Sequence, residues 1–185
     1  MKIKITSFLI FFSFFTYAQD KKSRFVEYLN MSSLSITKNT ESYFNDYRID
    51  EERATDGFGF DLNTIHGAKF FGYVSLSAGF SLDWNINKTF LSTPLIFDIR
   101  AFSSKTSENP LYLYLQTGPN IRWSDSIGSN GTSSKLGAGV IFKFDEHISY
   151  HVDIFRKSKV MRISDETHKG DYNITGYGIS LGMQF

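Results

Sequence analysis

Six polar side chains have the chemistry for charge pairing or proton transfer, and each lies on the polar side of a segment in which polar and apolar residues alternate. Successive residues of a β-strand point to opposite faces, so a period of two gathers these side chains on one face. Carboxylates beside cations form either a proton relay or a buried ion-pair network. The six residues are Asp83, Asp98, Arg100, Lys143, His151 and Asp153.

A second arrangement is the tripeptide His147-Ile148-Ser149. A histidine activates a serine as a nucleophile when an acid orients its ring. The His-x-Ser spacing resembles that of a barrel-shaped lipid A deacylase family, which implies a lipid hydrolase using Ser149 with His147. The nearby acids Glu146 and Asp153 stand at no diagnostic spacing, and a match this short is common in a chain rich in serine. We therefore predict no catalytic residues and keep the hydrolase as an alternative.

The composition does not favour binding of a metal, a cofactor or a nucleic acid. The chain has no cysteine and only four histidines, which are scattered. His147 and His151 would lie about 13 Å apart on a strand. The acidic stretches 51–53 and 165–169 are interpreted as solvated loop charge, with binding of a divalent ion as the alternative. With a formal net charge of +1 and no basic run, we predict no cofactor, no metal and no nucleic-acid partner.

The N-terminus indicates export. Lys2 and Lys4 precede an apolar run over residues 5–15, and Thr16-Tyr17-Ala18 supplies small residues at the exit. This pattern is typical of a secretory signal peptide, and the run is too short to span a bilayer. We predict cleavage after Ala18 and a single mature domain over residues 19–185.

The mature chain alternates in segments of about ten residues. Clear examples are residues 71–84, 135–144 and 177–185. We count eight such segments. In the first segment, within residues 24–37, the apolar residues change from one face to the other partway along. A β-bulge near Ser32-Ser33 would account for this change. Only helices and closed barrels satisfy the backbone in lipid, and no stretch is long enough for a membrane helix. The segments therefore predict an all-β fold: an eight-stranded antiparallel up-and-down transmembrane β-barrel.

The connections between the segments alternate in length. Long polar stretches at 38–56, 124–134 and 164–171 contrast with tight turns at 66–69 and 145–147. Outer-membrane barrels have long extracellular loops and short periplasmic turns. Because eight strands enclose room only for side chains, the six polar residues are predicted to form an internal network rather than a solute path.

Alternation alone leaves open which face points outward, since a soluble lipocalin-like barrel has the opposite arrangement. Aromatic residues near strand ends favour a membrane, because Trp, Tyr and Phe gather at lipid boundaries. The final strand, which ends on an aromatic residue, also resembles the signal that the barrel assembly machinery recognises, so that machinery is an expected partner. The predicted interfacial aromatics are Phe71, Trp84, Tyr112, Trp123, Phe144 and Phe185.

Four stretches carry a family resemblance: residues 93–100, 110–119, 136–140 and 179–185. They resemble the small outer-membrane β-barrel proteins of Bacteroidota, called porin-family or PorT-like barrels. The resemblance implies the fold and the outer membrane of a Gram-negative bacterium. It brings no catalytic residues and no defined substrate.

The leading hypothesis is a non-enzymatic integral outer-membrane protein that presents extracellular loops or forms part of an envelope assembly. Outer-membrane lipid and lipopolysaccharide are its expected surroundings. The alternatives are the Ser149/His147 hydrolase and a soluble periplasmic lipocalin-like carrier of an apolar ligand.

Overall fold

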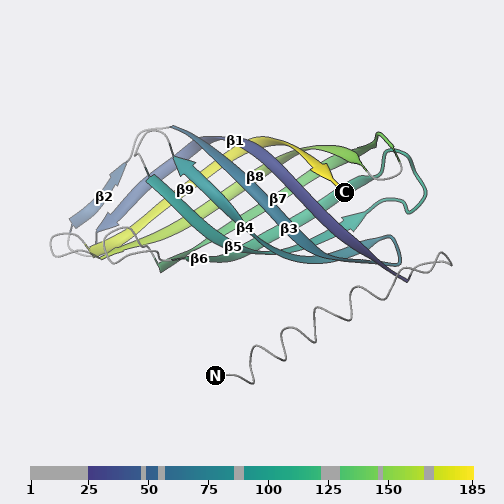
Figure 1. Cartoon of the computed structure of the whole chain (residues 1–185). Coiled ribbons are helices and arrows are strands. Elements are labelled where there is room, and N and C mark those ends of the chain that lie inside the picture. The colour runs from purple at the N-terminus through teal and green to yellow at the C-terminus, as the bar shows by residue number, and fades with distance from the viewer. Residues whose placement is uncertain are drawn as a thin grey trace, which may run out of the picture.

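The computed structural model describes residues 25–46, 49–53, 57–85, 90–121, 130–145, 148–164 and 169–185. In these ranges the chain forms antiparallel strands that close into a barrel, with β9 pairing back onto β1 (Figure 1). The predicted signal peptide, residues 1–18, lies outside them. The strands are β1 (Val26–Asp46), β2 (Ile49–Arg53), β3 (Phe58–Phe70), β4 (Val74–Asn85), β5 (Phe90–Phe102), β6 (Leu111–Ile121), β7 (Asn130–Lys143), β8 (Ser149–Ser164) and β9 (Lys169–Gln184).

The barrel wall has eight strands, as predicted. β1 and β3 to β9 follow one another around the wall, and each pairs with its neighbour in antiparallel register. Among the described strands, β2 pairs only with the far end of β1. It forms a hairpin with that end and is not one of the strands of the barrel wall. No helix in the described part of the chain is long and apolar enough to cross a membrane.

On most strands of the barrel wall, the apolar face looks outward. On β4 the side chain of Leu76 is 53% exposed, while Ser75 and Ser77 on either side of it are buried. The same arrangement, with the apolar side chain outside and the polar ones inside, holds on β5, where Ile99 is exposed between the buried Asp98 and Arg100. The period of two is therefore as predicted, and the structure supplies what alternation could not, namely which face points into the lumen.

The first strand departs from the prediction. Leu29 and Met31 point into the lumen, whereas Leu34 and Ile36 are exposed outside. Pairing with β3 is nonetheless unbroken from Val26 to Lys38, so the predicted bulge at residues 32–33 is wrong. The apolar phase changes because Leu29 and Met31 pack with interior residues of other strands, not because the backbone shifts. The irregularities in β1 lie further along, between Asn39 and Glu41 in its pairing with β9 and between Phe44 and Asp46 in its pairing with β2.

The first tight turn also lies elsewhere than predicted. Residues 66–69 belong to the ladder of β3, and the chain turns at residues 71–73. Phe71 and Gly72 both have positive φ, 53° and 78°, and the amide of Tyr73 donates to the carbonyl of Phe70 at 3.0 Å. Positive φ at both central positions is the geometry of a type I′ hairpin turn, whose twist matches the flanking strands.

The two ends of the barrel differ. One end, which we call the terminal end, holds the start of β1, the end of β9, the connections at 71–73 and 103–110, the end of β7 and the start of β8 (Figure 1). At the opposite end, the extension end, β1 continues to Asp46 and pairs with β2, while β8 and β9 remain paired as far as Ser164 and Lys169. The predicted long stretches at 38–56, 124–134 and 164–171 are thus partly strand.

Candidate functional site: the filled lumen

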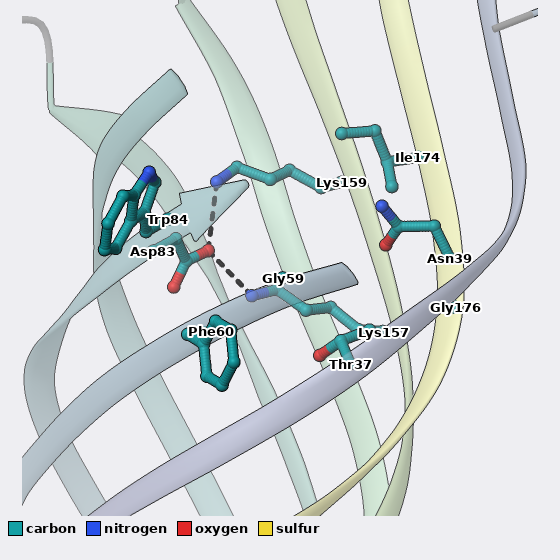
Figure 2. Close-up of a pocket in the computed structure, with 10 residues that line it drawn as sticks. All are labelled: Thr37, Asn39, Gly59, Phe60, Asp83, Trp84, Lys157, Lys159, Ile174 and Gly176. Carbon is teal, nitrogen blue, oxygen red and sulfur yellow. Dashed lines mark hydrogen bonds and ion pairs between the residues drawn. The ribbon is translucent and has the colours of Figure 1, made fainter. Parts of the chain in front are cut away.

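A chain of ion pairs crosses the lumen in the half nearer the extension end. Asp61 on β3 accepts hydrogen bonds from Lys135 on β7 at 2.8 Å and from Lys157 on β8 at 3.0 Å. Lys157 also pairs with Asp83 on β4 at 2.8 Å, and Lys159 pairs with the same carboxylate at 2.9 Å. Figure 2 shows the Asp83 carboxylate between the two ammonium groups. The network therefore ties β3 and β4 to β7 and β8 on the facing wall.

This first network carries three ammonium groups against two carboxylates. Asp61 and Asp83 are buried, and each carboxylate bonds two ammonium groups, so neither acid lacks a compensating cation. Lys159 also donates to the Ser92 hydroxyl, and Ser81 donates to Asp83 at 2.7 Å. Buried charges persist only when they are paired in this way.

Only Asp83 of these five residues was identified from the sequence. Asp61 and Lys135 stood on the polar faces of alternating segments, so the signal for them was present. Lys157 and Lys159 continue the phase of His151 and Asp153, but no local pattern indicates that the strand runs beyond residue 154. In the structure β8 continues to Ser164, which brings both lysines into the lumen.

A second network lies on β5 and β6. Arg100 donates from Nε to Asp98 at 3.0 Å, and Gln116 donates from Nε2 to the same carboxylate at 2.9 Å. Asn63 on β3 then donates to the Gln116 carbonyl at 3.2 Å. The Arg100 guanidinium also lies 4.5 Å from the centre of the Tyr114 ring, within cation–π range.

Asp153 is the acceptor for two tyrosines. Tyr112 donates to it at 2.9 Å and Tyr114 at 2.7 Å. His151, which is also buried, has its Nε2 4.0 Å from Asp153, too far for a hydrogen bond. Tyr112 is only 2% exposed, so its predicted place among the interfacial aromatics is wrong. Its neighbours Leu111 and Leu113 occupy the outward positions of β6 instead.

Five of the six predicted network residues lie in the lumen, and one does not. Asp83, Asp98, Arg100, His151 and Asp153 are all buried in the lumen. Lys143 has the inward phase of β7 but is exposed, because it is the last residue of that strand and reaches past the filled interior. Its predicted membership of the network is wrong.

The predicted aromatic girdle is spread over both ends of the barrel. Trp84 is exposed near the extension end, where it pairs with Phe60 and Leu91. Three others are exposed at the terminal end, and Trp123 lies outside the described residues. The three are Phe71, Phe144 and Phe185.

Large and small residues complement one another around the two lumen tyrosines, Tyr112 and Tyr114. A Cβ atom on Gly137 would lie 2.6 Å from the Tyr114 ring, and one on Gly139 would lie 2.6 Å from the Tyr112 ring. Phe102, Ile141 and Phe155 complete a buried cluster around the two tyrosines. Two cavities beside the ion pairs measure about 30 and 20 Å³, room for one water molecule each. Side chains therefore occupy most of the described lumen around the ion pairs.

The tyrosine–carboxylate contacts give a first prediction. Tyr114→Phe removes the donor to Asp153 without changing the ring, so we expect the free energy of unfolding to fall by about 2 kcal/mol. Urea titration of the protein folded in phospholipid vesicles, followed by tryptophan fluorescence, measures it. The matched control is Tyr150→Phe on the outer face of β8, which we expect to change stability by less than about 0.5 kcal/mol. Equal effects of the two changes would show that the Asp153 contact adds nothing.

Catalytic and metal chemistry gain no geometric support. Among the described residues, no three His, Cys, Asp or Glu side chains gather as a metal site would require. His147 lies outside the described residues. Ser149 begins β8 at the terminal end, where it pairs with Lys143 and Gln184. The hydrolase that would use His147 and Ser149 stays an alternative.

Comparison with known proteins supports the fold. No family model matches the chain, and a search of curated proteins finds no match. Among solved structures, the chain is similar to the crystal structure of Neisserial surface protein A (NspA), with a TM-score of 0.52 and 10% identity over 84% of this chain and 97% of that one. OmpT of Vibrio cholerae, described as outer-membrane expressed, aligns with a TM-score of 0.35 and 8% identity over 86% of this chain and 56% of that one, too distant to support an argument. At such identities the first similarity shows the barrel fold alone.

Proposed function

We propose that this protein is an integral outer-membrane β-barrel of a Gram-negative bacterium, with a closed lumen and no enzymatic activity. The observation that carries the proposal is the inverted distribution of side chains, apolar outside and polar within. On β4, Val74 to Trp84 spans ten residue steps with outward apolar side chains. At about 3.3 Å per residue and a tilt of about 45°, that band is roughly 23 Å tall, close to the band of about 25 Å that such barrels place in lipid.

The same distribution argues against a soluble carrier. A lipocalin-like barrel would need an apolar interior with room for a ligand and an outer face that water tolerates. Here the described lumen holds paired charges, and many large apolar side chains are exposed. An apolar surface of this extent calls for an apolar partner, and lipid covers all sides of a barrel at once.

The strand extensions orient the barrel. Outer-membrane barrels carry their longer segments on the extracellular side, and β1, β8 and β9 extend at one end only, so the extension end faces the outside and the terminal end is periplasmic. The hairpin of β1 with β2 and the far ends of β8 and β9 then stand on the cell surface. We propose that the protein acts through these extensions, as a surface element or as a component of an envelope assembly. A diffusion channel is disfavoured because side chains occupy most of the described lumen around the ion pairs.

The proposal also covers the route of export and the family of the protein. The N-terminal pattern supports the general secretory route, and the apolar alternation of β9 supports recognition by the barrel assembly machinery. The four resembling stretches support a place among the small barrels of Bacteroidota. The hydrolase remains the alternative. Its test is Ser149→Ala in cells lacking the native copy, where an altered lipid A acylation pattern would favour it and an unchanged pattern would dismiss it.

Surface display gives a second prediction. An epitope inserted between Asp46 and Ile49, where β1 passes to β2, should be labelled by antibody on intact cells. The matched control carries the same epitope between Ser104 and Ser107 in the periplasmic turn and should be labelled only after permeabilisation. The reverse pattern, or labelling of both on intact cells, would contradict the orientation.

A further inference from the structure

An open groove runs over the outer wall of the barrel, across β6 to β9 and β1. It measures about 840 Å³ and has small residues in its floor, Ala138 and Gly178 among them. Its walls are apolar side chains that stand well out from the barrel, such as Leu113, Leu136 and Ile154, each more than 60% exposed. The shape and chemistry suit one flexible hydrocarbon chain.

Two cations stand at the rim of this groove. Lys38 on β1 pairs across the sheet with Tyr177 on β9, which pairs in turn with Arg156 on β8. All three side chains are exposed on the outer face. Paired strands are about 4.8 Å apart, so the two cations flank the tyrosine with their backbones about 10 Å apart. Long side chains can close that gap around a single anionic group.

The row of Lys38, Tyr177 and Arg156 coincides with the edge of the apolar band. One step further toward the extension end, the outward positions are polar, with Thr175 beside Ser158. Tyrosine is favoured at such a boundary, and a lysine or arginine on the lipid face is tolerated only near it. The three side chains therefore lie at the depth where lipid headgroups begin.

Neither cation has an acidic partner in the part of the chain that the structure describes. Within the described ranges, no ion pair involves Lys38 or Arg156. One acid, Glu41, lies in the adjoining polar row, paired across the sheet with Thr175, so the two rows together remain positive. Two unpaired cations above an apolar groove match an amphiphile with an anionic head and acyl chains. A guanidinium and an ammonium are the groups proteins use to hold phosphate.

We propose that this face binds lipid A, with one acyl chain in the groove and a phosphate between Lys38 and Arg156. The inference rests on the proposed orientation, which puts the row in the outer leaflet where lipid A is the anionic lipid. The bound lipid would fix the depth and tilt of the extensions on the cell surface.

The test uses the mature protein folded in an uncharged detergent, with folding checked by its mobility on unboiled SDS gels. Native mass spectrometry then measures binding of diphosphoryl lipid A, dephosphorylated lipid A and phosphatidylglycerol. Lys38→Gln with Arg156→Gln removes both cations, and Lys105→Gln with Lys143→Gln is the charge-matched control at the other end. Ala138→Phe fills the groove without changing charge, and Ala78→Phe places the same ring on the outer face of β4.

We expect diphosphoryl lipid A to bind the unmodified protein at least about tenfold more tightly than either other lipid. The Lys38/Arg156 variant and Ala138→Phe should each lose about tenfold, and both controls should keep the unmodified affinity. Equal loss in variants and controls, or equal binding of phosphatidylglycerol, would overturn the inference. A protein that shows the gel shift but no lipid preference would refute the lipid site alone, whereas a protein without the shift would refute the membrane barrel itself.

Discussion

Asp61→Asn is expected to lower the free energy of unfolding by about 3–5 kcal/mol, because it leaves three lysines of the lumen, two of them buried, with a single carboxylate between them. Asp61 joins Lys135 on β7 to Lys157 on β8 from across the lumen, so its loss also removes the tie between facing walls. Urea unfolding in phospholipid vesicles measures the change. Glu108→Gln, in the exposed turn at 103–110, removes the same charge from solvent and should leave stability within about 0.5 kcal/mol.

A charge-balanced variant separates electrostatics from packing. Adding Lys135→Met to Asp61→Asn restores the original excess of one cation, and the Met side chain can keep the contact that Lys135 makes over the Phe155 ring. We expect the double change to regain at least half of the lost stability, since replacing a buried pair by apolar residues costs far less than breaking it. A double variant as unstable as Asp61→Asn alone would mean that packing, not unpaired charge, causes the loss.

Phe80→Arg is expected to destabilise the protein by about 2–4 kcal/mol in a membrane and to reduce its yield in the outer membrane. Phe80 is 52% exposed near the middle of the outer face of β4, where lipid would surround it. A soluble barrel would respond in the opposite way, because replacing an exposed phenylalanine by arginine makes the surface more compatible with water. The sign of the change therefore distinguishes the two environments.

The matched control for Phe80→Arg is Val74→Arg, on the same face at the start of the same strand. Near the interface an arginine reaches water, so we expect a cost of about 0–1 kcal/mol. Equal costs at the two positions would mean that no depth-dependent apolar medium surrounds β4. A gain in stability from Phe80→Arg would favour a soluble protein.

Much of the fold is encoded in a period of two. In segments such as β4, position alone assigns each residue to a face, and this suffices to place Asp83, Asp98 and Arg100 together on the inner side. Which face looks outward is not encoded in this way, since a lipocalin-like barrel shows the same alternation. Closure of the sheet and the filling of its interior decide that question.

The errors have local causes. Tyr112 begins a segment that is apolar on both faces, so its phase carries little information; it points inward because Gly139 leaves space for its ring. Lys143 has the right phase but lies at a strand end, where phase no longer decides burial. Lys157 was missed because the length of β8 depends on its pairing with β9, which no local pattern reveals.

The most direct test of the membrane barrel is to fractionate the cell envelope and run the protein on SDS gels with and without boiling. We expect recovery with the outer membrane and a faster band in the unboiled sample, because a closed barrel with ion pairs across its lumen resists the detergent until heated. Release with the soluble periplasmic fraction, with one mobility in both samples, would contradict it.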